Sequence, residues 1–201
     1  MGYYIRVLST SSKCIPVSYL QSAIEKDKLR ATISVEDGTS DDWTQLLLAH
    51  DDGTEIACIE RNVVQEDSLG SDEIGEFVDE VEDCKPASAA KWLIEYFSRI
   101  QCIYSFQLLG GTDQSNGWNI LGAIKNRIWS YAPSIIQADF EGFSNEKGYH
   151  ILWQFGDTVS GDWWVGVLQD GQWKHFQMDL GNRQQREAFF EGRVPEGAKL
   201  A

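Results

Sequence analysis

The sequence predicts an α+β protein in which about four to five helices pack on one face of a mostly antiparallel sheet, or sheets, ending in a C-terminal β-meander. Residues 135–140 and 149–155 alternate between apolar and polar side chains, as hairpin strands do. Residues 163–168 and 172–178 are the second predicted pair of strands. They are joined by Asp170-Gly171, a dipeptide that suits a type I′ turn because both central residues need φ > 0. Residues 1–64 show the order strand, helix, strand, strand, strand, which is typical of helices covering an antiparallel sheet.

The N-terminal elements are predicted from capping and turn signals. Residues 1–8 resemble a first strand, and Ser18 with Gln21 fits a capping box at the start of a helix. Residues 31–35 are predicted to form the second strand. Residues 43–49 and 55–64 flank a polar turn that contains Gly53, so they are predicted to form a hairpin.

An acidic segment, residues 66–83, holds nine acids and no base. Within it Ile74, Phe77, Val78 and Val81 recur at three- and four-residue spacing, which predicts an amphipathic helix with a thin apolar edge and an anionic face. Pro86 follows and marks a boundary, because the residue before a proline avoids the α conformation.

The second half is predicted to hold three further helices. Residues 86–104 form the most hydrophobic one, with an apolar stripe that continues through Ile100 and Ile103. Residues 110–117 are predicted to be a loop, and residues 118–129 the next helix. The last helix, residues 183–191, has Asn182 as its N-cap and Gly192 as its C-terminal stop.

The first hairpin of the predicted meander pairs residues 135–140 with residues 149–155 around a turn at Glu146-Lys147. That register places Asp139 opposite Gln154, and Phe143 opposite His150. One face is then apolar, whereas Gln137, Asp139, Glu141, His150 and Gln154 share the other. Asp139, Glu141 and His150 could form a small acid/base site. An ordinary solvated sheet face explains them better, because antiparallel sheets can leave one face in water.

The second hairpin pairs Leu168 with Trp173 and Gly166 with His175. Its less apolar face carries Trp164, Leu168, Trp173, His175 and Gln177. Two tryptophans and a histidine there predict either a recognition patch, because amphipathic aromatic residues anchor interfaces, or a face that a helix covers.

The predicted organisation is a single α+β domain over residues 1–198. The alternative is two lobes, residues 1–68 and 86–198, joined by an acidic helix over residues 69–84. The tail Lys199-Leu200-Ala201 looks like the start of a common expression-vector linker, and it is left out of the predicted fold.

Composition and motifs narrow the possible functions. The net charge of −14 repels nucleic acid and anionic membranes and attracts basic surfaces. The three histidines are dispersed, and no zinc spacing, P-loop, dinucleotide fingerprint or nucleophile elbow occurs. The chain is therefore predicted to be no enzyme and to need no metal or cofactor. Four widely spaced cysteines favour a reduced, cytoplasmic protein, with a periplasmic protein as the alternative.

The acidic segment, the lack of catalytic motifs and the aromatic meander together resemble the immunity proteins that bacteria make against their own secreted or contact-delivered toxins. This resemblance of general character implies a cytoplasmic protein that binds a basic toxin domain and occludes its active site. The hypothesised partner-binding residues are Asp72, Glu73, Glu76, Asp79, Glu80, Trp164, Trp173 and His175.

Two other functions remain open. A small-molecule or carbohydrate-binding domain, conceivably a hydrolase, would use Trp164, Trp173 and His175, or Asp139, Glu141 and His150, because planar aromatic rings stack on sugars and carboxylates bind hydroxyls. A nucleic-acid mimic that blocks a DNA-binding protein would use the same acidic face.

Overall fold

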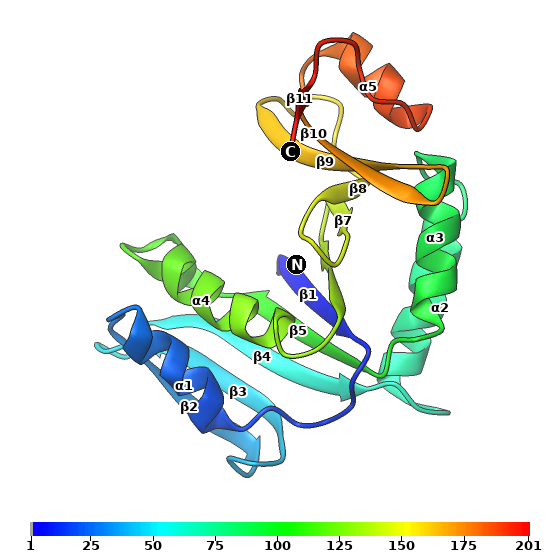
Figure 1. Cartoon of the computed structure of the whole chain (residues 1–201). Coiled ribbons are helices and arrows are strands. Elements are labelled where there is room, and N and C mark those ends of the chain that lie inside the picture. Colours follow the sequence, from blue (N-terminus) through cyan, green and yellow to red (C-terminus); the bar gives the residue numbers. More distant parts are fainter. Residues whose placement is uncertain (1) are drawn as a thin grey trace. The chain divides into compact units, whose positions relative to one another are not determined.

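The computed structural model describes residues 2–201 and confirms the α+β class (Figure 1). The chain divides into two compact units. Unit 1 comprises Met1–Ser71 and Ile100–Ser134, and unit 2 comprises Asp72–Arg99 and Ile135–Ala201. The chain enters unit 2 within the acidic helix. Residues 100–134 group with the N-terminal segment, whereas the two-lobe alternative placed them with the C-terminal lobe.

Unit 1 is built on a five-stranded antiparallel sheet. Its strand order is β1 (Tyr4–Ser9), β5 (Cys102–Leu108), β4 (Glu55–Val63), β3 (Trp43–His50) and β2 (Ala31–Gly38). Helices α1 (Val17–Lys26) and α4 (Gly117–Trp129) pack against each other, and α4 also contacts β1 and β4. A short 3₁₀ helix, η1 (Gly110–Asp113), lies where a loop was predicted.

Unit 2 contains a six-stranded sheet that is antiparallel except for one pair. Its order is β6 (Ser134–Ala138), β7 (Gly142–Ser144), β8 (His150–Trp153), β9 (Asp162–Gln169), β10 (Gln172–Asp179) and β11 (Lys199–Leu200). The β8–β9 pair is parallel. Helices α2 (Leu69–Val81), α3 (Ala87–Phe97) and α5 (Arg183–Phe190) complete the unit. A buried cluster at its centre comprises Val165, Val167, Phe176, Met178, Leu180 and Phe189.

Several predicted details are confirmed. The β9–β10 hairpin has the predicted register, with Leu168 opposite Trp173, and its turn residues Asp170 and Gly171 have φ of 49° and 73°. Asn182 caps α5, because its side chain accepts hydrogen bonds from the backbone N–H groups of the second and third helical residues. Gly192 follows α5 at a φ of 72°, in the left-handed region that ends many helices.

The predicted helix over residues 86–104 is wrong in its second part. Helix α3 ends at Phe97, and residues 102–108 form β5, which lies between β1 and β4. All five residues from Cys102 to Phe106 are buried. A strand covered on both faces has no alternating pattern, so its run of apolar residues resembles a continued helix.

The first predicted hairpin is also wrong in its register. The chain turns tightly after β6, with Phe140 at a φ of 62° and Gly142 at 116°, and forms β7 before β8. Phe143 therefore lies opposite Leu152, and His150 lies opposite Ser144. The turn that was predicted at Glu146-Lys147 joins β7 to β8 instead of β6 to β8.

Two terminal features differ from the predictions. Helix α1 begins at Val17 with Pro16 as its N-cap and no side-chain capping bond, so the predicted capping box at Ser18 does not form. The tail that was left out of the predicted fold contains β11, which pairs with β10 through Phe176 opposite Leu200 and Gln177 opposite Lys199.

Candidate functional site

All eight hypothesised partner-binding residues lie in unit 2, five on α2 and three on the β9–β10 hairpin. The inner edge of α2 is apolar: Val81 is fully buried, and the Phe77 ring lies 6.1 Å from Phe97 and 5.5 Å from Phe143. This packing turns the acidic side chains outwards. Four of them are exposed and Glu73 is half-buried; the exposed ones are Asp72, Glu76, Asp79 and Glu80.

Among residues 2–201, no ion pair involves Asp72, Glu76, Asp79 or Glu80. The pairs Asp72–Glu76 and Glu76–Glu80 are spaced four residues apart, and each such like-charge pair destabilises a helix by about 0.2–0.5 kcal/mol. The helix thus presents an anionic surface that the described part of the chain does not neutralise.

Six rings form a second feature of unit 2, here called the aromatic strip. Trp173 lies edge-on to Trp92 of α3 at 5.2 Å between centroids, and Trp92 contacts Tyr96 at 4.9 Å. Tyr149 stacks on His175 at 3.7 Å and meets Trp164 edge-on at 6.3 Å. The strip is made up of Tyr96, Trp92, Trp173, His175, Tyr149 and Trp164.

A helix covers part of this face, as one of the two alternatives predicted. Helix α3 covers Trp173 through Trp92, whereas Trp164 is 37% exposed. The Tyr96 hydroxyl donates a hydrogen bond to the Glu146 carboxylate at 2.7 Å, and burial together with that carboxylate raises the pKa of Tyr96. Among the six rings of the strip, the Trp164 ring is the most exposed to solvent.

The hydrogen bonds of Asn145 set the protonation of His175. The Asn145 side-chain oxygen accepts from the backbone N–H groups of Lys147 and Tyr149, so its amide nitrogen faces His175 Nε2 at 3.3 Å. Because an amide nitrogen only donates, Nε2 accepts and the imidazole carries its proton on Nδ1. Burial, and then the charge of Lys147, lower the pKa of His175, which agrees with a neutral ring.

The structure places the three residues of the alternative acid/base site in different elements. Asp139 and Glu141 lie in the tight turn between β6 and β7. His150 is buried between Phe155 and Trp163, at 4.8 Å and 5.7 Å between ring centroids, and its Nε2 has no hydrogen-bond partner among residues 2–201. Burial lowers the pKa of His150 to about 3, which keeps it neutral.

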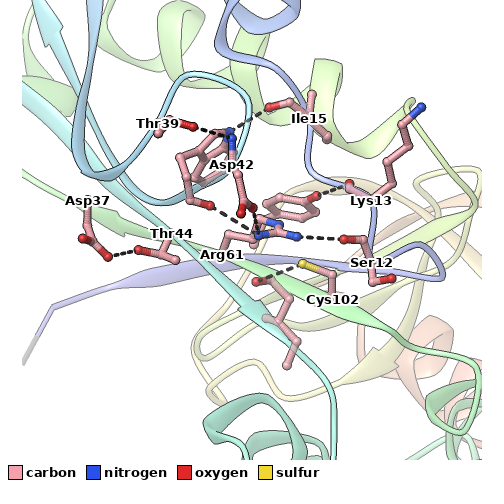
Figure 2. Close-up of polar contacts among 12 residues, drawn as sticks. Ser12, Lys13, Ile15, Asp37, Thr39, Asp42, Thr44, Arg61 and Cys102 are labelled. Atoms are coloured by element: carbon pink, nitrogen blue, oxygen red, sulfur yellow. Dashed lines mark hydrogen bonds and ion pairs between the residues drawn. The ribbon is translucent and has the colours of Figure 1, made fainter.

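Unit 1 contains a cation, Arg61, that is largely but not fully buried and that the sequence did not single out (Figure 2). Arg61 has only 10% of its side chain exposed. It donates to the Ser12 carbonyl at 2.8 Å and pairs with Asp42 at 3.4 Å. Trp43 Nε1 donates to the Ile15 carbonyl at 2.7 Å, so residues 12–15 are held by side chains of two strands. No local pattern marks Arg61, because its partners are distant in sequence.

Neither the Cys102 thiol nor the cavity of unit 1 points to a particular reaction. Burial raises the pKa of Cys102 to about 11, so its thiol stays protonated and is a poor nucleophile. A cavity of about 390 Å³ is lined by side chains of both charges, including Lys28, Arg30, Asp51 and Asp52.

Residues 2–201 contain no cluster of three or more histidine, cysteine, aspartate or glutamate side chains placed to hold a metal ion. Within the same residues, no helix has the length and apolar character needed to span a bilayer. No protein-family model, curated protein or solved structure matches the chain.

Proposed function

We propose that this chain is a non-catalytic interaction protein that binds a basic protein through α2, and that the partner is a toxin domain which the chain neutralises as an immunity protein does. The observation that carries the proposal is the outward acidic face of α2. Asp72, Glu76, Asp79 and Glu80 are exposed, repel one another, and form no ion pair among the described residues.

Like charges on α2 destabilise the free protein, and a basic partner would remove that repulsion on binding. The overall charge of −14 would also steer a cationic partner towards the chain and speed association at low ionic strength. Occlusion of a toxin active site needs no catalytic group, which agrees with a neutral, buried His150 and a protonated Cys102.

The first experiment is a capture from lysate of the source cell at low and then high salt, followed by mass spectrometry. A basic protein that is retained at low salt and released at high salt is expected. The test variant carries Asp72→Lys, Glu76→Lys and Asp79→Lys. The control carries Glu25→Lys, Asp41→Lys and Asp51→Lys, three exposed acids of unit 1.

The two triple variants are matched in charge. Each reversal adds two positive charges, so both change the net charge from −14 to −8. The α2 variant is expected to associate with the captured partner about tenfold more slowly, and the control to stay near the wild-type rate. Equal rates for the two variants would remove α2 from the interface.

The toxin part of the proposal has its own readout. The captured protein, expressed alone, is expected to arrest cell growth, and coexpression of this chain is expected to restore growth. A captured protein without toxicity would leave α2 as a binding surface and refute the immunity role. A glycan and metabolite screen by thermal shift tests the small-ligand alternative, with Trp164→Ala as the variant that should abolish any shift.

A further inference from the structure

The cavity of unit 1 lies where three segments meet at one end of its sheet (Figure 1). Its volume of about 390 Å³ is within the range of small-molecule sites. Residues 28–30 lead from α1 into β2, residues 50–52 lead from β3 into its turn to β4, and residues 115–116 precede α4. Because Ala31 pairs with His50, the first two segments leave the same end of the β2–β3 pair.

The first wall of this cavity is cationic. Lys28 and Arg30 line it with exposed side chains. Lys28 has a φ of 53°, in the left-handed region where glycine usually ends a helix, and its backbone N–H donates to the Glu25 carbonyl at 3.1 Å. Within residues 2–201, neither Lys28 nor Arg30 forms an ion pair or a side-chain hydrogen bond. Both cations are therefore available to a ligand.

The second wall, at the β3–β4 turn, consists of acceptors. Asp51 is exposed and forms no ion pair or side-chain hydrogen bond in the described part of the chain. Asp52 accepts a hydrogen bond from the backbone N–H of Thr54 at 2.9 Å, and this bond lowers the pKa of Asp52. His50 Nε2 lies 2.9 Å from the Gly111 carbonyl oxygen, which only accepts. The ring therefore carries a proton on Nε2, and in its neutral form Nδ1 is an acceptor.

The two walls do not neutralise each other. Among residues 2–201, no ion pair joins a side chain of residues 28–30 to Asp51 or Asp52. A ligand with a carboxylate at one end and an ammonium at the other complements both walls, whereas a singly charged ligand complements one wall and is repelled by the other. Leu29 and Ile120 also line the cavity, and their apolar atoms suit the methylene groups of such a ligand.

We propose that this cavity binds a small zwitterion, an amino acid or a short peptide, with its carboxylate at Lys28 and Arg30 and its ammonium at the acceptors of residues 50–52. Arginine pairs with carboxylates through two parallel hydrogen bonds, and an ammonium donates to carboxylates and to a neutral imidazole nitrogen. This site goes beyond the proposed function. It lies in unit 1, whereas the acids that are proposed to bind the partner lie in unit 2, so either proposal can fail without the other.

The first measurement is an NMR titration of the whole chain with zwitterions of increasing length. The probes are free glycine, β-alanine, γ-aminobutyrate, ε-aminocaproate, diglycine and triglycine. Saturable changes of backbone amide shifts are expected for at least one probe, and the largest changes are expected in residues 28–31, 50–54 and 115–120. One length is expected to bind best, because hydrogen-bonded turns hold both walls. If no probe gives saturable changes at these residues, the inference is overturned.

The second measurement blocks one end of the best probe at a time. The N-acetyl derivative lacks the ammonium, and the amide derivative lacks the carboxylate. Each is expected to bind about two- to fivefold more weakly than the zwitterion, which is the range for the loss of one exposed ion pair. Equal affinities of the zwitterion and both derivatives would show that the two walls do not act together, and would also overturn the inference.

Two variants test the orientation of the ligand. Arg30→Gln is expected to weaken binding of the zwitterion about two- to fivefold and to leave binding of the amide derivative unchanged, because that derivative has no carboxylate. Asp51→Asn is expected to weaken the zwitterion to the same extent and to leave the N-acetyl derivative unchanged. The matched control carries Lys91→Gln and Asp83→Asn, two exposed residues of unit 2, and is expected to change no affinity. Variants that weaken all three ligands equally, or none of them, would refute the proposed orientation and the site.

Discussion

The stability of unit 2 is expected to fall as the pH falls from 7 to 5 because of His150. In the folded chain, burial lowers the pKa of His150 to about 3, whereas an exposed histidine titrates near 6.5. The unfolded chain therefore binds a proton at pH 5 that the folded chain does not. By linkage, the contribution of the neutral His150 to the free energy of unfolding is fully present above about pH 6.5. It is lost progressively as the pH falls towards 3.

The magnitude follows from the two pKa values. Between the unfolded and the folded pKa of His150, the free energy of unfolding falls by about 5 kcal/mol in total, because each pH unit between those two pKa values is worth about 1.4 kcal/mol. Between pH 7 and pH 5 the fall is about 2 kcal/mol, since the unfolded histidine is mostly neutral until about pH 6.5. The lowered pKa of His175 acts in the same direction.

The assay is urea unfolding at pH 7, 6 and 5 for the wild type and for His150→Phe, which keeps a ring between Phe155 and Trp163. The wild type is expected to lose about 2 kcal/mol more than the variant between pH 7 and pH 5, while His175 and the carboxylates contribute equally to both. The variant also removes a buried Nε2 that has no hydrogen-bond partner among the described residues. Parallel pH profiles for the two proteins would refute a buried, neutral His150.

Three further substitutions test the local structure by chemical denaturation. Gly75→Ala in α2 should stabilise the chain by about 1 kcal/mol, because a Cβ there meets no atom within 4 Å and alanine favours the helix; no gain would contradict a helix at this position. Gly142→Ala should destabilise it by about 1–3 kcal/mol, since its Cβ would lie 2.2 Å from the Leu152 carbonyl oxygen at a φ of 116°; a neutral effect would refute the turn. Asn182→Ala should destabilise it by about 1 kcal/mol through loss of the α5 cap, whereas Asn182→Ser should keep most of the stability.

Much of the candidate surface could be predicted from neighbouring residues. The spacing of Phe77 and Val81 determined which side of α2 is buried, and the acids between them are exposed as expected. The Asp170-Gly171 turn determined the β9–β10 register, and with it the neighbours of Trp164, Trp173 and His175. These features depend on contacts within a few residues, which a local pattern records directly.

Contacts between distant residues decided the remaining features. Residues 102–108 became a strand because β1 and β4 flank them, and His150 became a core residue because Phe155 and Trp163 enclose it. The position of Asn145 beside His175, and of Lys199 over Trp164, likewise joins segments far apart in sequence. Which face of a strand is buried, and which group sets a pKa, depends on packing in three dimensions, and only the tertiary structure supplies those neighbours.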